Sequence, residues 1–273
     1  MHFLWRWKAL LNKTYTLPLS GWIILRQLLN GNFSIMSNHY FQFKQFTVQQ
    51  EHCAMKVCTD ACLFGALIAA TIQNRSIANI LDIGTGTGLL SLLLAQKTTA
   101  VIDAVEIAPA AYRQAKQNME ASPWQERLQV FNADITRFNN NKKYDCIISN
   151  PPFFEGDLKS NDQHKNAAKH DTTLTLEQLL QAVLQHLNND GLFAALIPWH
   201  RVPACIIAAE KAGLHLHQKT LVKQTPTHDY FRGILTFGKL PAEVLAEEIC
   251  IKNETGAYSN RFTQLLKDYY LYL

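Results

Sequence analysis

The chain has 273 residues, 48% of them apolar, which is enough for one large α/β domain with a full core. Cys53, Cys58 and Cys62 have irregular spacings and no Cys-x-x-Cys pair occurs, so free thiols in a reducing cytoplasm are expected and a metal site is not. The net charge of +4 does not indicate a basic nucleic-acid-binding domain, because the formal balance is zero from Met36 onward.

Residues 1–35 differ from the rest of the chain. They contain no acidic residue, and positions 5–8 (Trp-Arg-Trp-Lys) alternate aromatic with basic side chains. Their apolar run is interrupted by Pro18 and Gly21, is too short to span a membrane and lacks a small-residue cleavage site. We therefore expect an extension that is not part of the native fold, with Met36 as the candidate start and one domain at 36–273.

A strand, a glycine-rich loop and a helix are predicted in the first half of the chain. Ile80–Gly88 (Ile-Leu-Asp-Ile-Gly-Thr-Gly-Thr-Gly) is an apolar strand entering the loop, and the apolar run that follows predicts the helix. Gly84 and Gly86 permit positive φ and close approach of a ligand, whereas Gly88 lets the helix start tight against the strand. A dinucleotide fingerprint needs Gly or Ala at the position of Leu89, so a pyrophosphate site is disfavoured.

The next two predicted strands both end in a carboxylate. Val101–Glu106 places Glu106 where it can accept hydrogen bonds from both hydroxyls of a ribose. Leu128–Asp134 places Asp134 where it can accept from an adenine amino group. Either acid alone is more often a solvated residue at a strand end. The ordered succession of a glycine-rich end and two acidic ends favours a nucleoside-binding site.

The fourth predicted strand, at positions 144–149, is followed by Asn150-Pro151-Pro152-Phe153. Open α/β sheets bind ligands at the carboxyl ends of their strands, which is where this tetrapeptide falls. The amide oxygen of Asn150 and the carbonyl of Pro151 form a pair of acceptors suited to a planar NH₂ group. Phe153 can stack on the base or amide that carries the NH₂. Taken alone, Asn-Pro-Pro is more often a rigid turn.

The remaining pattern alternates helices and strands as in a doubly wound, mostly parallel sheet. Three further helices are expected. The first is capped by Asp60 and runs to about Ile72, the second runs from Pro109 to Glu120, and the third is opened by a capping box at Thr175–Gln178 and ended by Gly191. A fifth strand is expected at Leu192–Ile197. The polar stretch 154–171 is long enough to predict a functional or mobile loop.

This order of motifs resembles the class I S-adenosylmethionine-dependent methyltransferases, and the tetrapeptide resembles the (Asn/Asp/Ser)-Pro-Pro-(Tyr/Phe/Trp) signature of amino-group methylators. The resemblance implies an α/β doubly wound, mostly parallel seven-stranded sheet and S-adenosylmethionine as cofactor. It implies that the catalytic residues are Asn150, Pro151, Pro152 and Phe153. The cofactor-binding residues that it implies are Thr59, Asp82, Gly84, Gly86, Gly88, Glu106 and Asp134, with Asp82 near the amino-acid end of the cofactor.

A closer resemblance runs from about Phe41 to the C-terminus. Six segments are similar to the bacterial tRNA1(Val) (adenine-37-N6)-methyltransferases. They are Phe43–Val48, Cys53–Asp60, Gln117-Asn118, Ser122–Trp124, Ala133–Ile135 and Thr172–Leu174. This likeness implies transfer of a methyl group to N6 of adenosine 37 in the anticodon loop, with tRNA as the partner. The chain differs from the usual pattern at Phe153, where Tyr is more frequent, and at His228–Gly233, where relatives often have Pro-His-Arg.

Two other amino-group substrates remain open from the residues alone, namely a guanine N2 of ribosomal RNA and a glutamine N5 of a protein. A nicotinamide oxidoreductase is disfavoured by Leu89, and a non-catalytic RNA-binding module would not need the acceptor pair at 150–151. The C-terminal third is locally basic and is either a solvated face or a phosphate-contacting surface. Its cations are Arg201, Lys211, Lys219, Lys223, Arg232 and Lys239.

Overall fold

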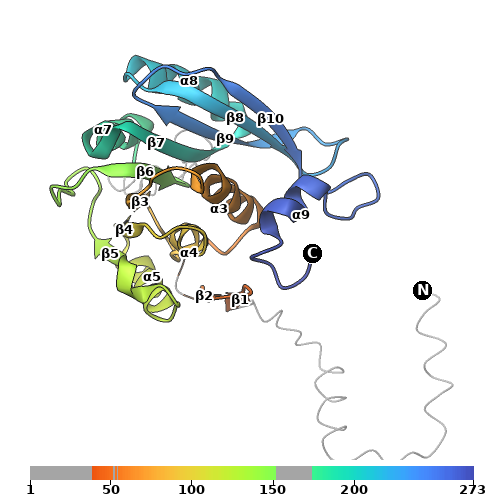
Figure 1. Ribbon diagram of the computed structural model, residues 1–273, viewed down its shortest axis with the longest axis horizontal. Coiled ribbons are helices and arrows are strands. Elements are labelled where there is room, and N and C mark those ends of the chain that lie inside the picture. Colours follow the sequence, from red (N-terminus) through yellow and green to blue (C-terminus); the bar gives the residue numbers. More distant parts are fainter. Residues whose placement is uncertain (1–38, 52, 54, 152–173) are drawn as a thin grey trace, which may run out of the picture. The chain divides into compact units, whose positions relative to one another are not determined.

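A computed structural model describes residues 39–51, 53, 55–151 and 174–273. The expected extension at 1–35 lies outside the described residues, and so do Pro152, Phe153 and the polar stretch that follows them. Two sheets are present in the described part, a two-stranded β1-β2 sheet and an eight-stranded sheet of order β10-β8-β9-β7-β6-β3-β4-β5 (Figure 1). In the large sheet only β9 runs antiparallel to its neighbours.

The described elements are, in chain order, β1 Tyr40–Gln42, β2 Thr47–Gln49, α3 Thr59–Ile72, β3 Asn79–Ile83, α4 Leu89–Ala95, β4 Val101–Glu106, α5 Pro109–Glu120, η1 Gln125–Arg127, β5 Leu128–Asn132, β6 Tyr144–Ser149, α7 Leu176–His186, β7 Leu187–Pro198, η2 Trp199–Arg201, α8 Val202–Lys211, β8 His215–Lys223, β9 Tyr230–Gly238, β10 Leu245–Cys250 and α9 Asn260–Leu266.

The doubly wound, mostly parallel sheet expected from the sequence is confirmed, but it has eight strands and not seven. The additional strand is β10, which pairs in parallel with β8 at the edge of the sheet. Half of its residues are exposed, and two adjacent glutamates, Glu247 and Glu248, lie at its centre. An exposed, charged edge strand lacks the apolar run that predicts a buried strand, so the sequence pattern gave no signal for it.

The direction of winding reverses between β3 and β6. The chain passes from β3 through α4 to β4 and through α5 to β5, and Gly88 at the start of α4 lies against Ala115 and Met119 of α5, so both helices cover one face. From β6 the chain turns the other way, and α7 and α8 pack on the opposite face with side chains of β6 and β7. The β3–β6 boundary is therefore the topological switch point, where open sheets of this type bind ligands.

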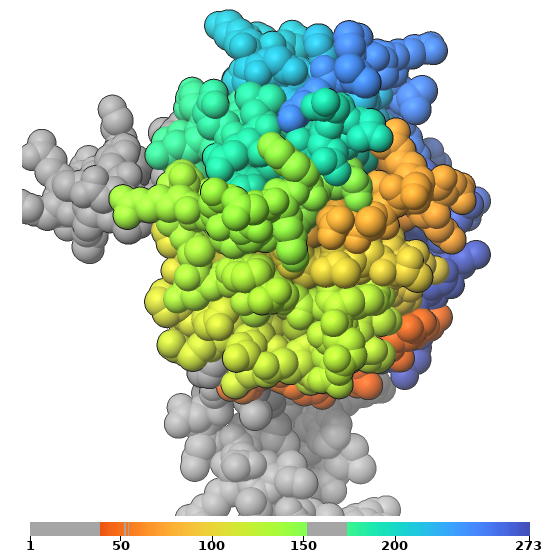
Figure 2. Space-filling view, turned by 60° about the vertical axis from the view of Figure 1, so that its left-hand side comes forward, coloured from red at the N-terminus to blue at the C-terminus, as the bar shows by residue number. Residues whose placement is uncertain are grey.

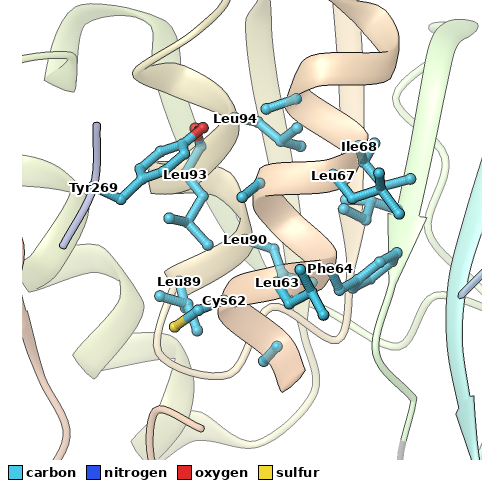
Figure 3. Packing of buried hydrophobic residues seen from close by; sticks show 14 of the residues in the cluster. Cys62, Leu63, Phe64, Leu67, Ile68, Leu89, Leu90, Leu93, Leu94 and Tyr269 are labelled. Atoms are coloured by element: carbon cyan, nitrogen blue, oxygen red, sulfur yellow. The ribbon is translucent and has the colours of Figure 1, made fainter. Parts of the chain in front are cut away.

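Helices α3 and α4 pack closely against each other in the core. Gly65 of α3 faces Leu93 of α4, and a Cβ at position 65 would lie only 2.5 Å from Leu93 Cδ1. Figure 3 shows the apolar side chains of the two helices meeting there, with the ring of Tyr269 beside Leu93. The glycine at 65 thus lets the two helices approach each other closely. In the space-filling view, residues of α5 and β5 (light green) gather in the lower half and those of α7 to β10 (teal to blue) in the upper half (Figure 2).

Several expected boundaries are confirmed and others are corrected. Helix α5 runs from Pro109 to Glu120, and the capping box at Thr175 opens α7 with both of its hydrogen bonds present. Asp60 does not cap α3, because the helix already begins at Thr59 and the carboxylate of Asp60 accepts from Arg232. Helix α7 ends at His186, five residues before Gly191, since the chain enters β7 directly at Leu187.

Candidate functional site

The register of the central strands brings the predicted site residues to one edge of the sheet. Ile83, the last residue of β3, pairs with Val105 of β4 and with Ser149 of β6. Glu106 pairs with Asn132, the last residue of β5. Parallel strands that end in register place the residues following them side by side, about 4.8 Å apart from one strand to the next. The glycine loop is therefore flanked by Glu106 on one side and by Asn150 on the other.

The glycine loop has the conformation that its sequence predicts. Gly84 and Gly86 have φ values of 71° and 59°, in the left-handed region, and a Cβ at either position would meet nothing within 4 Å. The N–H groups of Gly84 and Thr85 donate to the carbonyl of Val105 at 2.9 and 3.2 Å, which fixes the loop against β4. The space around the two glycines is open, so a ligand can approach the backbone there.

Gly88 has a different environment from the other two glycines. It is the N-cap of α4 with a φ of 83°, and a Cβ would lie 3.3 Å from Met119 Cε and 3.6 Å from Ala115 Cα. Its lack of a side chain therefore serves the close packing of α4 on α5. A direct contact of Gly88 with a cofactor stays a prediction.

Asp82 is completely buried at the base of the loop. Its Oδ2 accepts hydrogen bonds from the hydroxyls of Thr85 (2.6 Å) and Ser91 (2.7 Å), whereas its Oδ1 has no partner among the described groups. Burial is the main cause that raises the pKa of this carboxyl to about 6, and the two hydroxyls oppose the rise. A buried carboxylate oxygen without a partner is costly, so the site is suited to a ligand that supplies a cation or a donor.

Glu106 is buried at the end of β4 and links two segments of the site. Its Oε2 accepts from the N–H of Gly86 and its Oε1 from the N–H of Ala108, both at 2.9 Å. A carboxylate has about four acceptor positions, so each oxygen retains the capacity for one more donor. This carboxylate is held in one orientation and can accept two vicinal hydroxyls.

Asp134 lies two residues beyond β5 and not at its last residue. Its Oδ1 accepts from the N–H (2.9 Å) and the hydroxyl (2.8 Å) of Thr136, as in a turn closed by an aspartate. The N–H of Ala133 donates to the carbonyl of Glu106 at 3.2 Å, which keeps this turn beside β4. The carboxylate is thus placed one strand farther from the switch point than Glu106.

Asn150 and Pro151 follow β6 directly, and the structure describes both. Asn150 is half-buried and Pro151 is buried. The preceding hydroxyl of Ser149 donates to the carbonyl of Ile83 at 2.9 Å, which fixes the end of β6 against the end of β3. Asn150 and Pro151 therefore lie next to the start of the glycine loop, and their role as a pair of acceptors stays a prediction.

Asn118 belongs to one of the segments that carry the family resemblance, and its side chain connects three parts of the site. It is buried in α5, and its Nδ2 donates to the carbonyls of Thr87 and Gln49, both at 2.8 Å, while its Oδ1 accepts from the N–H of Gln49 at 2.9 Å. One side chain thus joins α5, the glycine loop and the β1-β2 hairpin. Asparagine at that position in a helix gives no signal by itself, because its partners are 31 and 69 residues away.

Thr59 is the first residue of α3, and the ion pair of Asp60 with Arg232 (2.7 Å) ties this end of the helix to the start of β9. The causes that lower the pKa of Asp60 are hydrogen bonds from Cys58 and Arg232 and the charge of Arg232, which together outweigh its burial. A cofactor contact of Thr59 stays a prediction.

Within the described ranges no cluster of three His, Cys, Asp or Glu side chains is placed to hold a metal, and no helix there has the length and apolarity needed to cross a membrane.

Comparison with known proteins gives matches over most of the chain. The family described as Methyltransferase small domain matches residues 64–197. The tRNA1(Val) (adenine(37)-N6)-methyltransferase of Phocaeicola vulgatus is 39% identical over 236 residues, which are 86% of this chain and 99% of that protein. The protein of the same name from Dyadobacter fermentans is 41% identical over 239 residues, covering 86% of this chain and 98% of its own.

Solved structures support the fold. A predicted O-methyltransferase from Agrobacterium tumefaciens superimposes with a TM-score of 0.58 at 18% identity, covering 77% of this chain and 96% of its own. A Listeria monocytogenes protein described as a class I S-adenosylmethionine-dependent methyltransferase superimposes with a TM-score of 0.54 at 14% identity, covering 73% of this chain and 67% of its own. At these identities the similarity shows the architecture of the sheet and no more.

Proposed function

Since the chain belongs to the tRNA1(Val) (adenine(37)-N6)-methyltransferase family, we propose that it transfers a methyl group to N6 of adenosine 37 in the anticodon loop of tRNA1(Val). The observation that carries the proposal is the position of Asn150 and Pro151, at the end of β6 and beside the glycine loop. A pair of acceptors at the switch point suits an exocyclic amino group. Membership of the family implies S-adenosylmethionine as the methyl donor.

The described residues fit S-adenosylmethionine. The open space at Gly84 and Gly86 admits the donor to the backbone, and the unpartnered Oδ1 of Asp82 suits its ammonium group. Glu106 retains one acceptor position on each oxygen for the two ribose hydroxyls. We propose Asp134 as the acceptor for the adenine amino group, from its place beyond β5. Bound in this way, S-adenosylmethionine supplies an activated methyl group on a sulfonium.

The residues of the chain are proposed to act by positioning and electrostatics. The adenosine must leave its stack to reach the site, which costs little for an anticodon-loop base that is already unpaired. The side-chain oxygen of Asn150 and the carbonyl of Pro151 then accept the two N6 hydrogens. These bonds draw the nitrogen lone pair out of conjugation with the ring and orient it for attack. A strong base is not required, because the methylated nitrogen becomes acidic and loses its proton to water.

Phe153 is proposed to stack on the adenine during this step, and together with Pro152 it lies outside the described residues. Its replacement by alanine would act mainly on capture of the RNA, because stacking contributes to binding of the base. The reaction needs tRNA, and we propose that the protein acts in the cytoplasm, where tRNA is found.

The function is tested on tRNA from cells that lack this protein and on unmodified tRNA1(Val) incubated with the purified protein. Nucleoside mass spectrometry should find N6-methyladenosine missing from position 37 in the first and formed at that position in the second. Ribosomal RNA and total protein from the same cells serve as comparison substrates. Loss of N2-methylguanosine or of N5-methylglutamine, with tRNA unchanged, would replace the proposed substrate by one of those two.

The titration of Asp82 predicts a pH dependence of cofactor binding. Burial raises the pKa of this carboxyl from 3.8 to about 6, so the free protein becomes less stable as the pH rises through that interval. An ammonium group on Oδ1 favours the ionised form, so binding releases a proton below pH 6. Affinity for S-adenosylhomocysteine should fall as the pH is lowered below about 6, by up to about tenfold per pH unit.

Isothermal titration between pH 5 and 7.5 measures this dependence, with Asp82→Asn as the comparison. The variant cannot titrate, so its affinity should be lower at pH 7.5 and nearly flat across the range. An equally steep fall in the variant would assign the pH dependence to another group and remove Asp82 from contact with the ammonium.

Residues 36–273 are proposed to form the whole catalytic domain. The relatives above are matched almost in full by 86% of this chain. A protein that starts at Met36 should therefore methylate tRNA at the rate of the full chain. Residues 1–35 carry four cations and no acid, so their removal should reduce only nonspecific RNA binding that is sensitive to salt. Turnover and binding at two salt concentrations test this, and loss of methylation on truncation would contradict the boundary.

A further inference from the structure

An aromatic pair lies at the same edge of the sheet as the candidate site. Trp199 starts η2, directly after β7 ends, and Tyr230 is the first residue of β9. β7 and β9 are neighbours, with Pro198 paired to Arg232, so the two rings come together at a centroid distance of 5.0 Å and a tilt of 52°. Trp199 is 36% exposed, and neither ring has a role in the proposed methyl transfer.

Tyr230 is held in place by its other neighbours. The ammonium of Lys223 lies over its ring, 4.4 Å from the centroid, and its hydroxyl donates to Glu248. Lys223 Nζ also lies 3.4 Å from Oε1 of Glu248, so Tyr230, Lys223 and Glu248 all contact one another. Since Lys223 occupies a face of the Tyr230 ring, Trp199 offers the larger open aromatic surface, and Tyr230 supports it from the side.

The position of Trp199 relative to the acceptor pair follows from the strand register. Ala195 of β7 pairs with Ser149 of β6, so Asn150 is one residue and Trp199 four residues beyond that pair. At about 3.3 Å per residue along a strand and about 4.8 Å between strands, the two backbones are on the order of 10 Å apart. A single-stranded nucleotide next to the extruded adenosine can reach across such a separation.

The charges near the pair favour a base as occupant over a phosphate. Lys223 is paired with Glu248, and Arg232 is paired with Asp60 at 2.7 Å. Each of these two cations is engaged by a carboxylate of the protein, so the aromatic surface of Trp199 is the feature at this edge that favours a base.

We propose that Trp199, supported by Tyr230, stacks on a nucleobase that flanks the methylated adenosine in the anticodon loop. The inference rests on the proposed function and assigns to it a second contact with the RNA. Stacking on an aromatic side chain tolerates any base, because every base has a π face. The contact therefore provides affinity and fixes the register of the loop, while the acceptor pair selects the amino group.

The protein side of the test compares Trp199→Ala and Trp199→Phe with wild type, using full-length unmodified tRNA1(Val). Trp199→Ala should weaken tRNA binding by about 5- to 150-fold, and Trp199→Phe should retain most of the affinity. The slope of affinity against salt should stay as in wild type, because no phosphate contact is lost. S-adenosylhomocysteine should bind all forms equally. Ile207→Ala serves as the matched control, because Ile207 is an exposed apolar residue (53%) on α8.

The RNA side uses tRNA1(Val) with an abasic residue at either position next to adenosine 37. One of the two abasic tRNAs should bind wild type more weakly, and the same change should have no effect on binding by Trp199→Ala. The stacking contact would be overturned if Trp199→Ala binds intact tRNA as tightly as wild type does. It would also be overturned if Trp199→Ala loses affinity by the same factor on intact and on abasic tRNA. The proposed function would survive either result as long as wild type methylates intact tRNA. If wild type itself does not methylate intact tRNA1(Val), the proposed function fails and the inference with it.

Discussion

Replacing Asn150 by alanine is expected to lower kcat for tRNA methylation by about 10²- to 10³-fold, as observed when one preorganised hydrogen-bonding group is removed from an active site. The amide oxygen of Asn150 accepts one N6 hydrogen, and this bond matters most as the amino nitrogen pyramidalises. Its loss therefore affects the transition state more than the ground state. Single-turnover rates with saturating tRNA and S-adenosylmethionine measure the effect.

The affinity of Asn150→Ala for S-adenosylhomocysteine should stay close to wild type, because the methyl donor is held by other strand ends. Asn150→Asp is the conservative control, since the (Asn/Asp/Ser)-Pro-Pro-(Tyr/Phe/Trp) signature allows aspartate at this position and aspartate keeps an acceptor oxygen. It should recover part of the rate that alanine loses. Wild-type turnover by Asn150→Ala would remove Asn150 from catalysis. Equal losses in both variants, with weaker cofactor binding, would indicate a structural role at the end of β6.

The sequence predicted best those features that depend on neighbouring residues. An apolar strand followed by glycines predicted the loop at Gly84 and Gly86, whose positive φ values only glycine adopts readily. The ends of the central strands were predicted because buried parallel strands are continuous apolar runs. The register that aligns Glu106 and Asn150 on either side of the loop follows from those ends.

Contacts between distant segments could not be predicted in this way. Asn118 joins the glycine loop to the β1-β2 hairpin, and its partners are identifiable only once the chain is folded. The same holds for the pair of Trp199 and Tyr230, which lie on different strands. Asp60 was expected to cap α3 because aspartate favours that position, but its ion pair with Arg232 decides its orientation. In each case a tertiary contact overrides or adds to the local preference.

The basic C-terminal region shows how composition can mislead. Lys223, Arg232 and Lys239 were candidates for phosphate contacts, yet each has a partner within the protein. Lys239 donates to carbonyls near the end of α7, where a cation also interacts favourably with the helix dipole. Burial lowers its pKa, and the nearby charge of Lys143 adds to that effect. Counting cations in a segment therefore overestimates the charge that is available to RNA.

Replacing Glu106 by alanine is expected to weaken binding of S-adenosylhomocysteine by about 1–3 kcal/mol, which is the cost of leaving hydrogen-bonding groups unmatched. The carboxylate is expected to accept from both ribose hydroxyls, and it already holds the N–H groups of Gly86 and Ala108. The alanine variant thus loses the ribose contact and also the support of the glycine loop. Isothermal titration gives the total effect of the two.

A ligand that lacks the 2′-hydroxyl separates these two contributions. Wild type should bind 2′-deoxy-S-adenosylhomocysteine more weakly than the parent compound, whereas Glu106→Ala should bind both alike, because the partner of that hydroxyl is gone. A penalty for the deoxy compound that is the same in both proteins would show that Glu106 supports only the glycine loop. Tight binding of NAD without binding of S-adenosylhomocysteine would contradict the assignment of the whole site. The loop geometry opposes that outcome, since Gly88 packs on α5 and the next residue is Leu89, where a pyrophosphate site needs glycine or alanine.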